Sequence, residues 1–364
     1  MKNTFGQSVS YTLFGESHGE EIGIIIDGLA PGIKIESDYI RLQLDRRRPS
    51  GRISTSRSEA DNFRIVSGVW NGYTTGTPIC ILIPNTNKKS GDYSKLAELP
   101  RPGHADYTAI CKYHGYQDYR GGGHFSGRLT APIVAAGAIA NLALMQKDIY
   151  IGTHIKSLAG IMDRDFDEGD LQNDIKRLSL SNFPVLSEEA GQLMRGEAEK
   201  AASEGDSVGG ILETVVTGIP AGVGEPWFDS AESILSHAMF SIPAVKGIEF
   251  GKGFGFAEMR GSEANDTFTT NGKTVTTKTN HNGGINGGIT NGMPIVLRLA
   301  IKPTPSIFKE QETVDLGKME NTKLCIEGRH DPTIVHRAAP VADAMTAMVL
   351  CDLLSGRYGT DYLK

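Results

Sequence analysis

Residues 130–146 read TAPIVAAGAIANLALMQ, and this stretch predicts the helix around which the rest of the chain folds. It is rich in strong helix formers, and Pro132 falls in the first turn, where a proline is tolerated. Thr130 is the expected N-terminal cap. Because almost every side of this helix is apolar, we expect it to be buried within the core rather than to lie on a surface.

Strand and helix patterns alternate irregularly on both sides of this helix. The expected strands are 8–14, 23–27, 74–84, 214–219 and 295–301. The expected helices are 37–48 with Ser37 as its cap, 188–203 capped by Ser187, one that begins at Asp229 with Glu232 at capping-box spacing, and 338–354. Because this order has no strict βαβ period, it favours an α+β layered sandwich over a doubly wound parallel sheet.

The organisation of the chain predicts a single unit that spans residues 1–364. We find no fixed-period repeat, no low-complexity tract and no linker in the sequence. Residues 163–186 are polar and poorly periodic, and they are therefore interpreted as an insertion or a mobile loop.

Composition narrows the class of protein. The net charge of −6 argues against a general nucleic-acid binder, because such domains carry an excess of positive charge. No run of eighteen apolar residues and no secretory signal is visible, so we expect a protein that neither spans a membrane nor is exported. The four cysteines are scattered and include no Cys-x-x-Cys pair, which is typical of a cytoplasmic protein with reduced thiols. The sequence also lacks the spacing of a dedicated metal site.

Glycine is the clearest outlier, at 44 of 364 residues. The segment Arg120–Arg128, with glycines at 121, 122 and 123, comes just before the central helix. Backbone N–H groups and the helix dipole could form an anion site there, although a tight structural turn explains the same glycines. The segment is neither a P-loop nor a dinucleotide fingerprint, because it lacks the Gly-Lys-Ser/Thr ending and a preceding apolar strand.

A cluster of arginines follows the helix predicted at 37–48. Arg46, Arg47 and Arg48 precede Pro49, and Arg52 and Arg57 follow within ten residues. The cluster fits cations at a helix C-terminus followed by a solvated loop. It equally fits guanidinium forks that hold carboxylate or phosphate groups in a focused pocket.

Three further polar residues are candidates for acid–base chemistry. His18 lies in Gly-Glu-Ser-His-Gly and His104 in Arg-Pro-Gly-His-Ala-Asp, and both positions read as loops. An imidazole in a loop is either structural or a general acid that titrates near neutral pH. Asp331 stands between His330 and Pro332, where it is either a capping aspartate or a carboxylate beside cations.

Taken in order, these segments resemble the chorismate synthase family over residues 5–355. The motifs that carry the resemblance are Phe14-Gly15-Glu16-Ser17-His18-Gly19, Asp45-Arg46-Arg47-Arg48-Pro49, Arg101-Pro102-Gly103-His104-Ala105-Asp106, Asp118-Tyr119-Arg120-Gly121-Gly122-Gly123, Gly205-Asp206-Ser207, Pro220-Ala221-Gly222, Gly224-Glu225-Pro226, Lys302-Pro303-Thr304 and Gly328-Arg329-His330-Asp331-Pro332.

The resemblance implies a lyase that makes chorismate, at the last step of the shikimate pathway. The reaction is the anti-1,4-elimination of phosphate from 5-enolpyruvylshikimate 3-phosphate, and it requires reduced FMN without net redox change. The resemblance also implies a single β-α-β sandwich of antiparallel sheets with central helices, and a cytoplasmic homotetramer. It leaves open whether NADPH reduces the flavin on this protein or a separate reductase supplies reduced flavin.

The resemblance further implies roles for individual residues. His18 would be the acid that helps phosphate leave, His104 would protonate or stabilise the reduced flavin, and Asp331 would act with the flavin in removing the ring hydrogen. Ser17 and Ser126 would orient these groups. The residues implied to contact FMN are His124, Phe125, Ser126, Pro243, Ala244, Gly287, Lys302, Pro303, Thr304, Pro305, Ser306 and Arg329. The residues implied to hold the anions of the substrate or of NADP are Arg47, Arg48, Arg52, Arg120 and Arg329.

Several positions depart from the family pattern. The family usually reads Arg-Arg-Arg-Pro-Gly, Arg-Ser-Ser-Ala-Arg and Lys-Pro-Thr-Ser-Ser, and it often has Asn where this chain has Pro243. This chain has Ser50, His124-Phe125 with Gly127, and Pro305 at the corresponding positions. These differences affect the expected FMN contacts and leave the expected acid and base residues unchanged.

Two other functions are compatible with single motifs. Glycine loops and arginines also suit a kinase or another phosphate-binding transferase, but the kinase signatures and the P-loop lysine are missing. The arginines between 46 and 57 could bind RNA or DNA, against the negative total charge. Binding of ATP without FMN would favour the first, and a steeply salt-dependent affinity for nucleic acid would favour the second.

Overall fold

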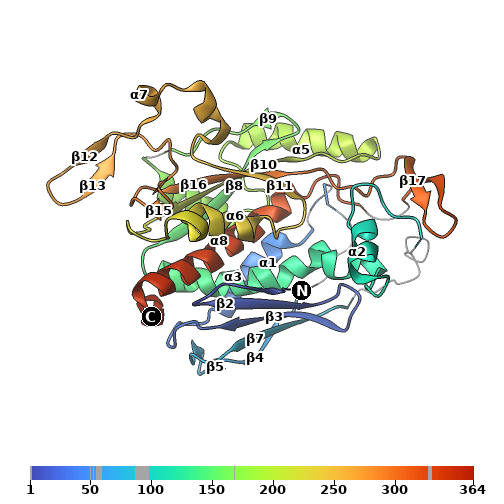
Figure 1. Cartoon of the computed structure of the whole chain (residues 1–364), viewed down its shortest axis with the longest axis horizontal. Coiled ribbons are helices and arrows are strands. Elements are labelled where there is room, and N and C mark those ends of the chain that lie inside the picture. The colour runs from blue at the N-terminus through green and yellow to red at the C-terminus, as the bar shows by residue number, and fades with distance from the viewer. Residues whose placement is uncertain are drawn as a thin grey trace.

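The computed structural model describes residues 2–49, 51, 53–54, 60–86, 98–167, 169–326 and 330–364. Two five-stranded antiparallel sheets enclose a layer of helices (Figure 1). The layered α+β sandwich expected from the sequence is therefore confirmed.

The first sheet has the strand order β1-β2-β3-β7-β4. Its strands are β1 (Thr4–Phe5), β2 (Ser10–Gly15), β3 (Glu21–Asp27), β7 (Ile79–Pro84) and β4 (Arg64–Ser67). Alternate residues of β7 face the core, since Ile79, Ile81 and Ile83 are buried. The predicted strand at 74–84 is thus confirmed only from residue 79 onward.

The second sheet has the strand order β11-β16-β10-β8-β9. Its strands are β11 (Val245–Phe250), β16 (Ile295–Ile301), β10 (Gly210–Thr217), β8 (Tyr150–Leu158) and β9 (Ile161–Met162). One cross-strand row on this sheet alternates in charge, with His154 beside Glu213, Arg298 beside Glu213, and Glu249 beside Arg298. This pairing of opposite charges favours one register.

The central layer consists of α1 (Ser37–Arg47), α3 (Thr130–Met145) and α8 (Val335–Tyr358), with α6 (Ala231–Met239) beside α8. The other helices are α2 (Asp106–Tyr113), α4 (Leu171–Leu178), α5 (Glu188–Ser203) and α7 (Gly261–Ala264). The 3₁₀ turns are η2 (Arg120–Phe125), η3 (Gly127–Leu129), η4 (Trp227–Asp229), η5 (Gly253–Glu258) and η6 (Thr360–Leu363). The short strands are β5 (Val69–Trp70), β6 (Tyr73–Thr74), β12 (Phe268–Thr270), β13 (Val275–Thr277), β14 (Ile285–Asn286), β15 (Ile289–Thr290), β17 (Gln311–Asp315) and β18 (Glu320–Leu324).

Helices α3 and α8 pack closely against each other at the centre of the sandwich. A methyl group on Gly137 would lie 2.3 Å from Cβ of Ala344, so the absence of a side chain is what allows this approach. Residues 127–145 and 335–358 are each long and apolar enough to cross a membrane, but 89% of the most apolar window of each is buried inside the protein. Both segments are therefore the core helices of a layered fold.

Four of the predicted helix starts are wrong in detail, and one of them is that of α8, which begins at Val335 rather than at residue 338. Helix α1 has Glu36 rather than Ser37 at its cap position, and Thr130 does not cap α3 but donates its hydroxyl to the carbonyl of Gly127 at 2.6 Å. Helix α6 begins at Ala231 after Ser230, whose hydroxyl accepts the N–H of Ser233. Several residues that can cap a helix lie close together in these segments, so the sequence pattern alone does not determine the residue at which each helix begins.

Residues 163–186 are not a loop throughout, which corrects the interpretation from sequence. They contain α4, whose Ile175 and Leu178 are buried. The carboxylate of Asp163 accepts the N–H groups of Leu186 and Ser187 at 2.6 and 2.8 Å, and it thereby ties this segment to the start of α5. The polar composition that indicated a loop is that of a helix with one apolar face.

Candidate active site

A cavity of about 670 Å³ lies where the N-terminal ends of α3 and α8 meet the segment between α6 and β11. This volume is within the range of about 300–1,000 Å³ that is common for small-molecule sites. Many of the predicted site residues line the cavity. These are Arg47, His104, His124, Phe125, Ser126, Pro243, Ala244, Lys302, Thr304, Pro305, Ser306 and Asp331.

The remaining predicted site residues occupy other places. Ser17 and His18 are buried directly behind Gly121, which is part of the cavity wall. Arg48, Arg120, Pro303 and Gly287 are outside the wall that the described residues form. Arg52, Arg57, Arg329 and Ser50 lie outside the described residues.

The triple-glycine turn contributes Gly121 to the wall of the cavity. Gly121, Gly122 and Gly123 have φ angles of 60°, 87° and 53°, which glycine adopts without strain. A methyl group on Gly123 would lie 2.0 Å from the carbonyl oxygen of Asp118, and one on Gly121 would lie 2.1 Å from Cε1 of His18. The glycines are therefore required by both the backbone geometry and the close packing of His18.

The imidazole of His18 is fixed by its neighbour. Oγ of Ser17 lies 3.1 Å from Nδ1 of His18 and 3.2 Å from the carbonyl oxygen of Arg120. Because that carbonyl can only accept, the hydroxyl donates to it and accepts the Nδ1–H of His18. The serine thus directs the ring behind Gly121, with His18 only 4% exposed.

A buried carboxylate holds two arginines on the cavity wall. Asp61 binds Arg47 at 2.5 Å through Oδ2 and Arg128 through Oδ1, and its own side chain is 0% exposed. Burial by itself raises the pKa of Asp61, but the two guanidinium groups outweigh burial and lower the pKa below its ordinary value. Arg128 also donates from Nε to Oδ1 of Asn85 at 3.0 Å.

His104 belongs to a second set of charged groups. Its Nδ1 lies 2.6 Å from Oδ1 of Asp106, and Arg101 holds the same carboxylate with its Nε and Nη2 at 2.7 and 2.8 Å. Burial opposes ionisation of Asp106, but the hydrogen bonds from Arg101 and His104 lower its pKa far below the ordinary value. Nζ of Lys302 donates to the carbonyl of Gly103 next to this histidine.

Asp331 faces the cavity from the opposite side. Its Oδ2 accepts from Nη1 of Arg337 at 2.6 Å, and its backbone carbonyl accepts from Oγ1 of Thr304 at 2.7 Å. Nε of Arg337 donates to the carbonyl of Arg47 at 3.0 Å. Asp331 is therefore not a helix cap, because α8 begins at Val335 with Ile334 at its cap position.

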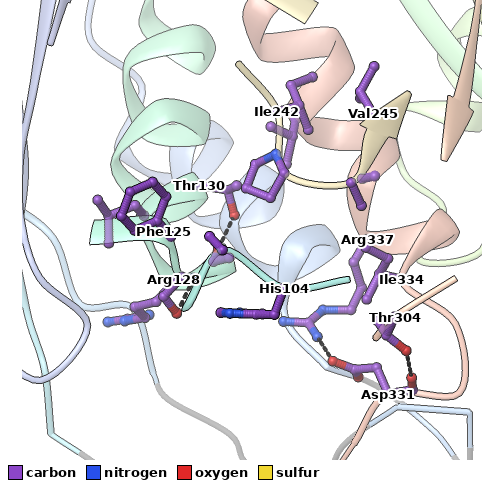
Figure 2. A pocket seen from close by; sticks show the side chains of 18 of the residues that line it. His104, Phe125, Arg128, Thr130, Ile242, Val245, Thr304, Asp331, Ile334 and Arg337 are labelled. Atoms are coloured by element: carbon purple, nitrogen blue, oxygen red, sulfur yellow. Dashed lines mark hydrogen bonds and ion pairs between the residues drawn. The ribbon is translucent and has the colours of Figure 1, made fainter. Parts of the chain in front are cut away.

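The cavity has a polar end and an apolar end. His104 lies between Arg128 and Arg337 near Asp331, while Ile242 and Val245 are at the other end (Figure 2). The described lining carries four cationic side chains, Arg47, Arg128, Lys302 and Arg337, against the single carboxylate of Asp331. This arrangement suits a polyanionic ligand that also presents a flat apolar surface.

Sequence reasoning missed several residues of this site. Arg128, Arg101 and Asp106 lie within segments that stand out in the sequence, but no role is assigned to these three residues from the sequence. Asp61 and Arg337 had no local pattern, because their roles depend on partners brought together by the fold.

Arg46 is not part of a solvated loop, since it is 1% exposed and pairs with Asp343 at 3.0 Å. Among the residues in the described ranges, no three His, Cys, Asp or Glu side chains form a metal-binding group.

Comparisons with known proteins point to one family. A sequence model of the chorismate synthase family matches residues 9–354. The chain is 48% identical over 352 residues to a chorismate synthase of Thermococcus gammatolerans, with 97% of each chain covered. It is 48% identical over 349 residues to that of Pyrococcus abyssi, with 96% of each covered. A crystal structure of a chorismate synthase superimposes with a TM-score of 0.77 at 28% identity, covering 97% of this chain and 94% of the other.

Proposed function

The chain belongs to the chorismate synthase family, and on that premise we propose that the cavity beside the triple-glycine turn is its active site. Enzymes of this family are lyases that convert 5-enolpyruvylshikimate 3-phosphate to chorismate by anti-1,4-elimination of phosphate, and they need reduced flavin. The observation that carries the proposal is that cationic side chains, His104 and Asp331 meet around one cavity of suitable size.

The residues around the cavity fit a reduced FMN. The segment Ile242–Val245 and Ile334 supply apolar contacts for a flat ring, and Lys302 is a cation for a phosphate. The proposed FMN contacts are His124, Phe125, Ser126, Pro243, Ala244, Lys302, Pro303, Thr304, Pro305, Ser306, Gly287 and Arg329. When bound, the flavin supplies electron density that no side chain can supply.

The substrate carries a phosphate and two carboxylates, so the protein must neutralise several negative charges. We propose Arg47 for this task together with Arg48, Arg52, Arg120 and Arg329, and the same cations are the candidates for NADP. Arg47 is already held against a buried carboxylate, so its guanidinium needs little further ordering when an anion arrives. The cationic wall stabilises charge that develops on the departing phosphate.

Three side chains are proposed to move protons. His18 donates a proton to the leaving phosphate, with Ser17 orienting its ring. His104 would protonate or stabilise a bound reduced flavin, and Ser126 would help to orient these groups. Asp331 is proposed to act with the flavin in removing the ring hydrogen, and Nη1 of Arg337, 2.6 Å from Oδ2, orients its carboxylate.

The assembly and location of the protein are proposed on the same premise. We infer a single domain over residues 1–364, supported by one large hydrophobic core that includes both sheets and the central helices. A cytoplasmic homotetramer is proposed from the family. Gly287, a proposed FMN contact, lies in the exposed turn between β14 and β15, outside the cavity wall that the described residues form.

The proposal is tested by turnover in the absence of oxygen. Purified protein with reduced FMN and 5-enolpyruvylshikimate 3-phosphate should release phosphate and chorismate in equal amounts, and oxidised FMN should support neither. Folded, flavin-loaded protein that forms neither product would contradict the proposal. The same assay with FMN and NADPH as the only reductant, with and without oxygen, decides whether this protein reduces its own flavin.

A further inference from the structure

We propose that Asp106 is a positioning residue that holds His104 in the tautomer with its proton on Nδ1, so that Nε2 is the nitrogen presented to the cavity. This inference rests on the proposed function, in which His104 acts on the bound flavin. The two residues are two positions apart, and Asp106 is the first residue of α2. Their contact is short, with 2.6 Å between Nδ1 and Oδ1.

The first step of the argument is that Asp106 is ionised. Arg101 contributes three donors to this one carboxylate: its backbone N–H at 3.0 Å from Oδ2, its Nε at 2.7 Å from Oδ2, and its Nη2 at 2.8 Å from Oδ1. The side chains of Arg101 and Asp106 are only 8% and 12% exposed, so water competes little for these bonds. An ionised carboxylate can only accept hydrogen bonds, and the proton of the contact with His104 must therefore be on Nδ1.

One contact of His104 would by itself favour the other tautomer, but the shorter contact with Asp106 outweighs it. Nη2 of Arg101 lies 3.0 Å from Nδ1 of His104, and this nitrogen is a permanent donor. If Nδ1 had no proton, it would accept from Arg101, but its lone pair would also face Oδ1 of Asp106 at 2.6 Å. Two acceptors at that distance repel each other. The arrangement in which Arg101 and His104 both donate to Oδ1 of Asp106 is free of this conflict.

The other edge of the ring faces the triple-glycine turn. A methyl group on Gly122 would lie 3.5 Å from Cε1 and 3.7 Å from Nε2 of His104, and 3.8 Å from Cβ of Ser126. The ring lies in the cavity between Arg128 and Arg337 (Figure 2). Nε2 is thus the atom that can accept a proton from a bound group or return one to it.

A purely structural role for Asp106 makes a different prediction. Asp106 stands in the first turn of α2, where a negative charge stabilises a helix through the dipole. That role would not depend on which nitrogen of His104 carries the proton. Asp106→Asn separates the two roles: it keeps the size of the side chain, but its amide nitrogen is a donor that cannot replace both accepting oxygens between Arg101 and His104.

The tautomer is read directly by magic-angle-spinning NMR of protein labelled with ¹³C- and ¹⁵N-histidine, at a pH where His104 is neutral. The chain has nine histidines, and the signals missing from His104→Gln identify the ring in question. We expect the shifts of a ring protonated on Nδ1 in the ligand-free protein, and a loss of that pattern in Asp106→Asn. A ring protonated only on Nε2 in the unaltered protein would overturn the proposal.

Turnover supplies the second readout. Asp106→Asn should lower kcat/KM by about 100-fold or more, the typical contribution of a positioned acid or base, while FMN still binds. Asp106→Glu, which keeps a carboxylate, should recover part of the loss, and Asp38→Asn at an exposed pair should leave turnover unchanged. Turnover of Asp106→Asn within threefold of the unaltered protein would contradict the proposal.

The two readouts fail independently. Unaltered protein that gives no turnover with reduced FMN contradicts the proposed function, while the NMR spectrum of the ligand-free protein still decides the tautomer. If Asp106→Asn does not fold, the spectrum of the unaltered protein alone supports or overturns the assignment.

Discussion

Replacing Asp61 by Asn should destabilise the protein strongly, because this carboxylate is the shared partner of Arg47 and Arg128. The side chains of Asp61, Arg47 and Arg128 are 0%, 5% and 8% exposed, so the change removes the buried negative charge that the two guanidinium groups share. Breaking a buried ion pair by removing one partner costs about 3–5 kcal/mol in the free energy of unfolding. Asn is the suitable replacement, because residue 61 has a φ of 48° and Asn tolerates this region as Asp does.

The measurement is urea denaturation followed by circular dichroism, with Asp38→Asn as the matched control. Asp38 pairs with Arg41 on the same helix as Arg47, but its side chain is 98% exposed, and its loss should change stability by less than about 0.5 kcal/mol. The pKa of Asp61 is lowered on folding, so its contribution is complete well above pH 4 and disappears as the pH falls through its folded value. Asp61→Asn would refute the reasoning if it lowered the free energy of unfolding by less than about 1 kcal/mol at pH 7, or if it lowered it by as much in strong acid as at pH 7.

Two further variants test other parts of the site. Gly121→Ala places a methyl group 2.1 Å from the ring of His18, so this variant should lose most turnover while it still binds FMN. Gly115→Ala is the control, because Gly115 also has a positive φ but its added methyl group would meet open space, and this variant should keep its turnover. Equal turnover in the two variants would contradict the assigned packing of His18 against Gly121. Burial lowers the pKa of His336 to about 3, so the unfolded chain takes up this proton first as the pH falls below 6.5. Lowering the pH from 7 to 5 should therefore reduce the free energy of unfolding by about 2 kcal/mol through this group alone. Urea denaturation at the two pH values should show a decrease that is smaller by this amount in His336→Gln than in the unaltered protein. Equal decreases in the two proteins would count against a neutral, buried ring.

Local signals in the sequence predicted part of the fold. Helix α5 has the predicted bounds of 188 and 203, because Ser187 accepts the N–H of Ala190 as a capping residue does. Strand β16 runs over the predicted residues 295–301, where β-branched and apolar residues are bounded by a proline. Both elements are determined by residues close together in the chain.

Long-range contacts explain what the sequence did not reveal. The segment 163–186 is polar and poorly periodic, which favours a loop in the sequence. The contact that holds it, between Asp163 and His154 on β8, is one that polarity and periodicity do not encode. In the same way, Asp61 meets Arg128 across 67 positions of sequence, and no motif marks it. The motifs selected many residues that line the cavity, but they did not identify the partners that hold those residues in place.

The most direct test of the central claim is a crystal structure with oxidised FMN and 5-enolpyruvylshikimate 3-phosphate bound together. We predict that the flavin ring lies against Pro243 and Ala244, between His104 and Asp331, and that the phosphate of the substrate lies beside the triple-glycine turn in front of His18. A flavin bound elsewhere on the protein, with this cavity filled only by water, would contradict the account.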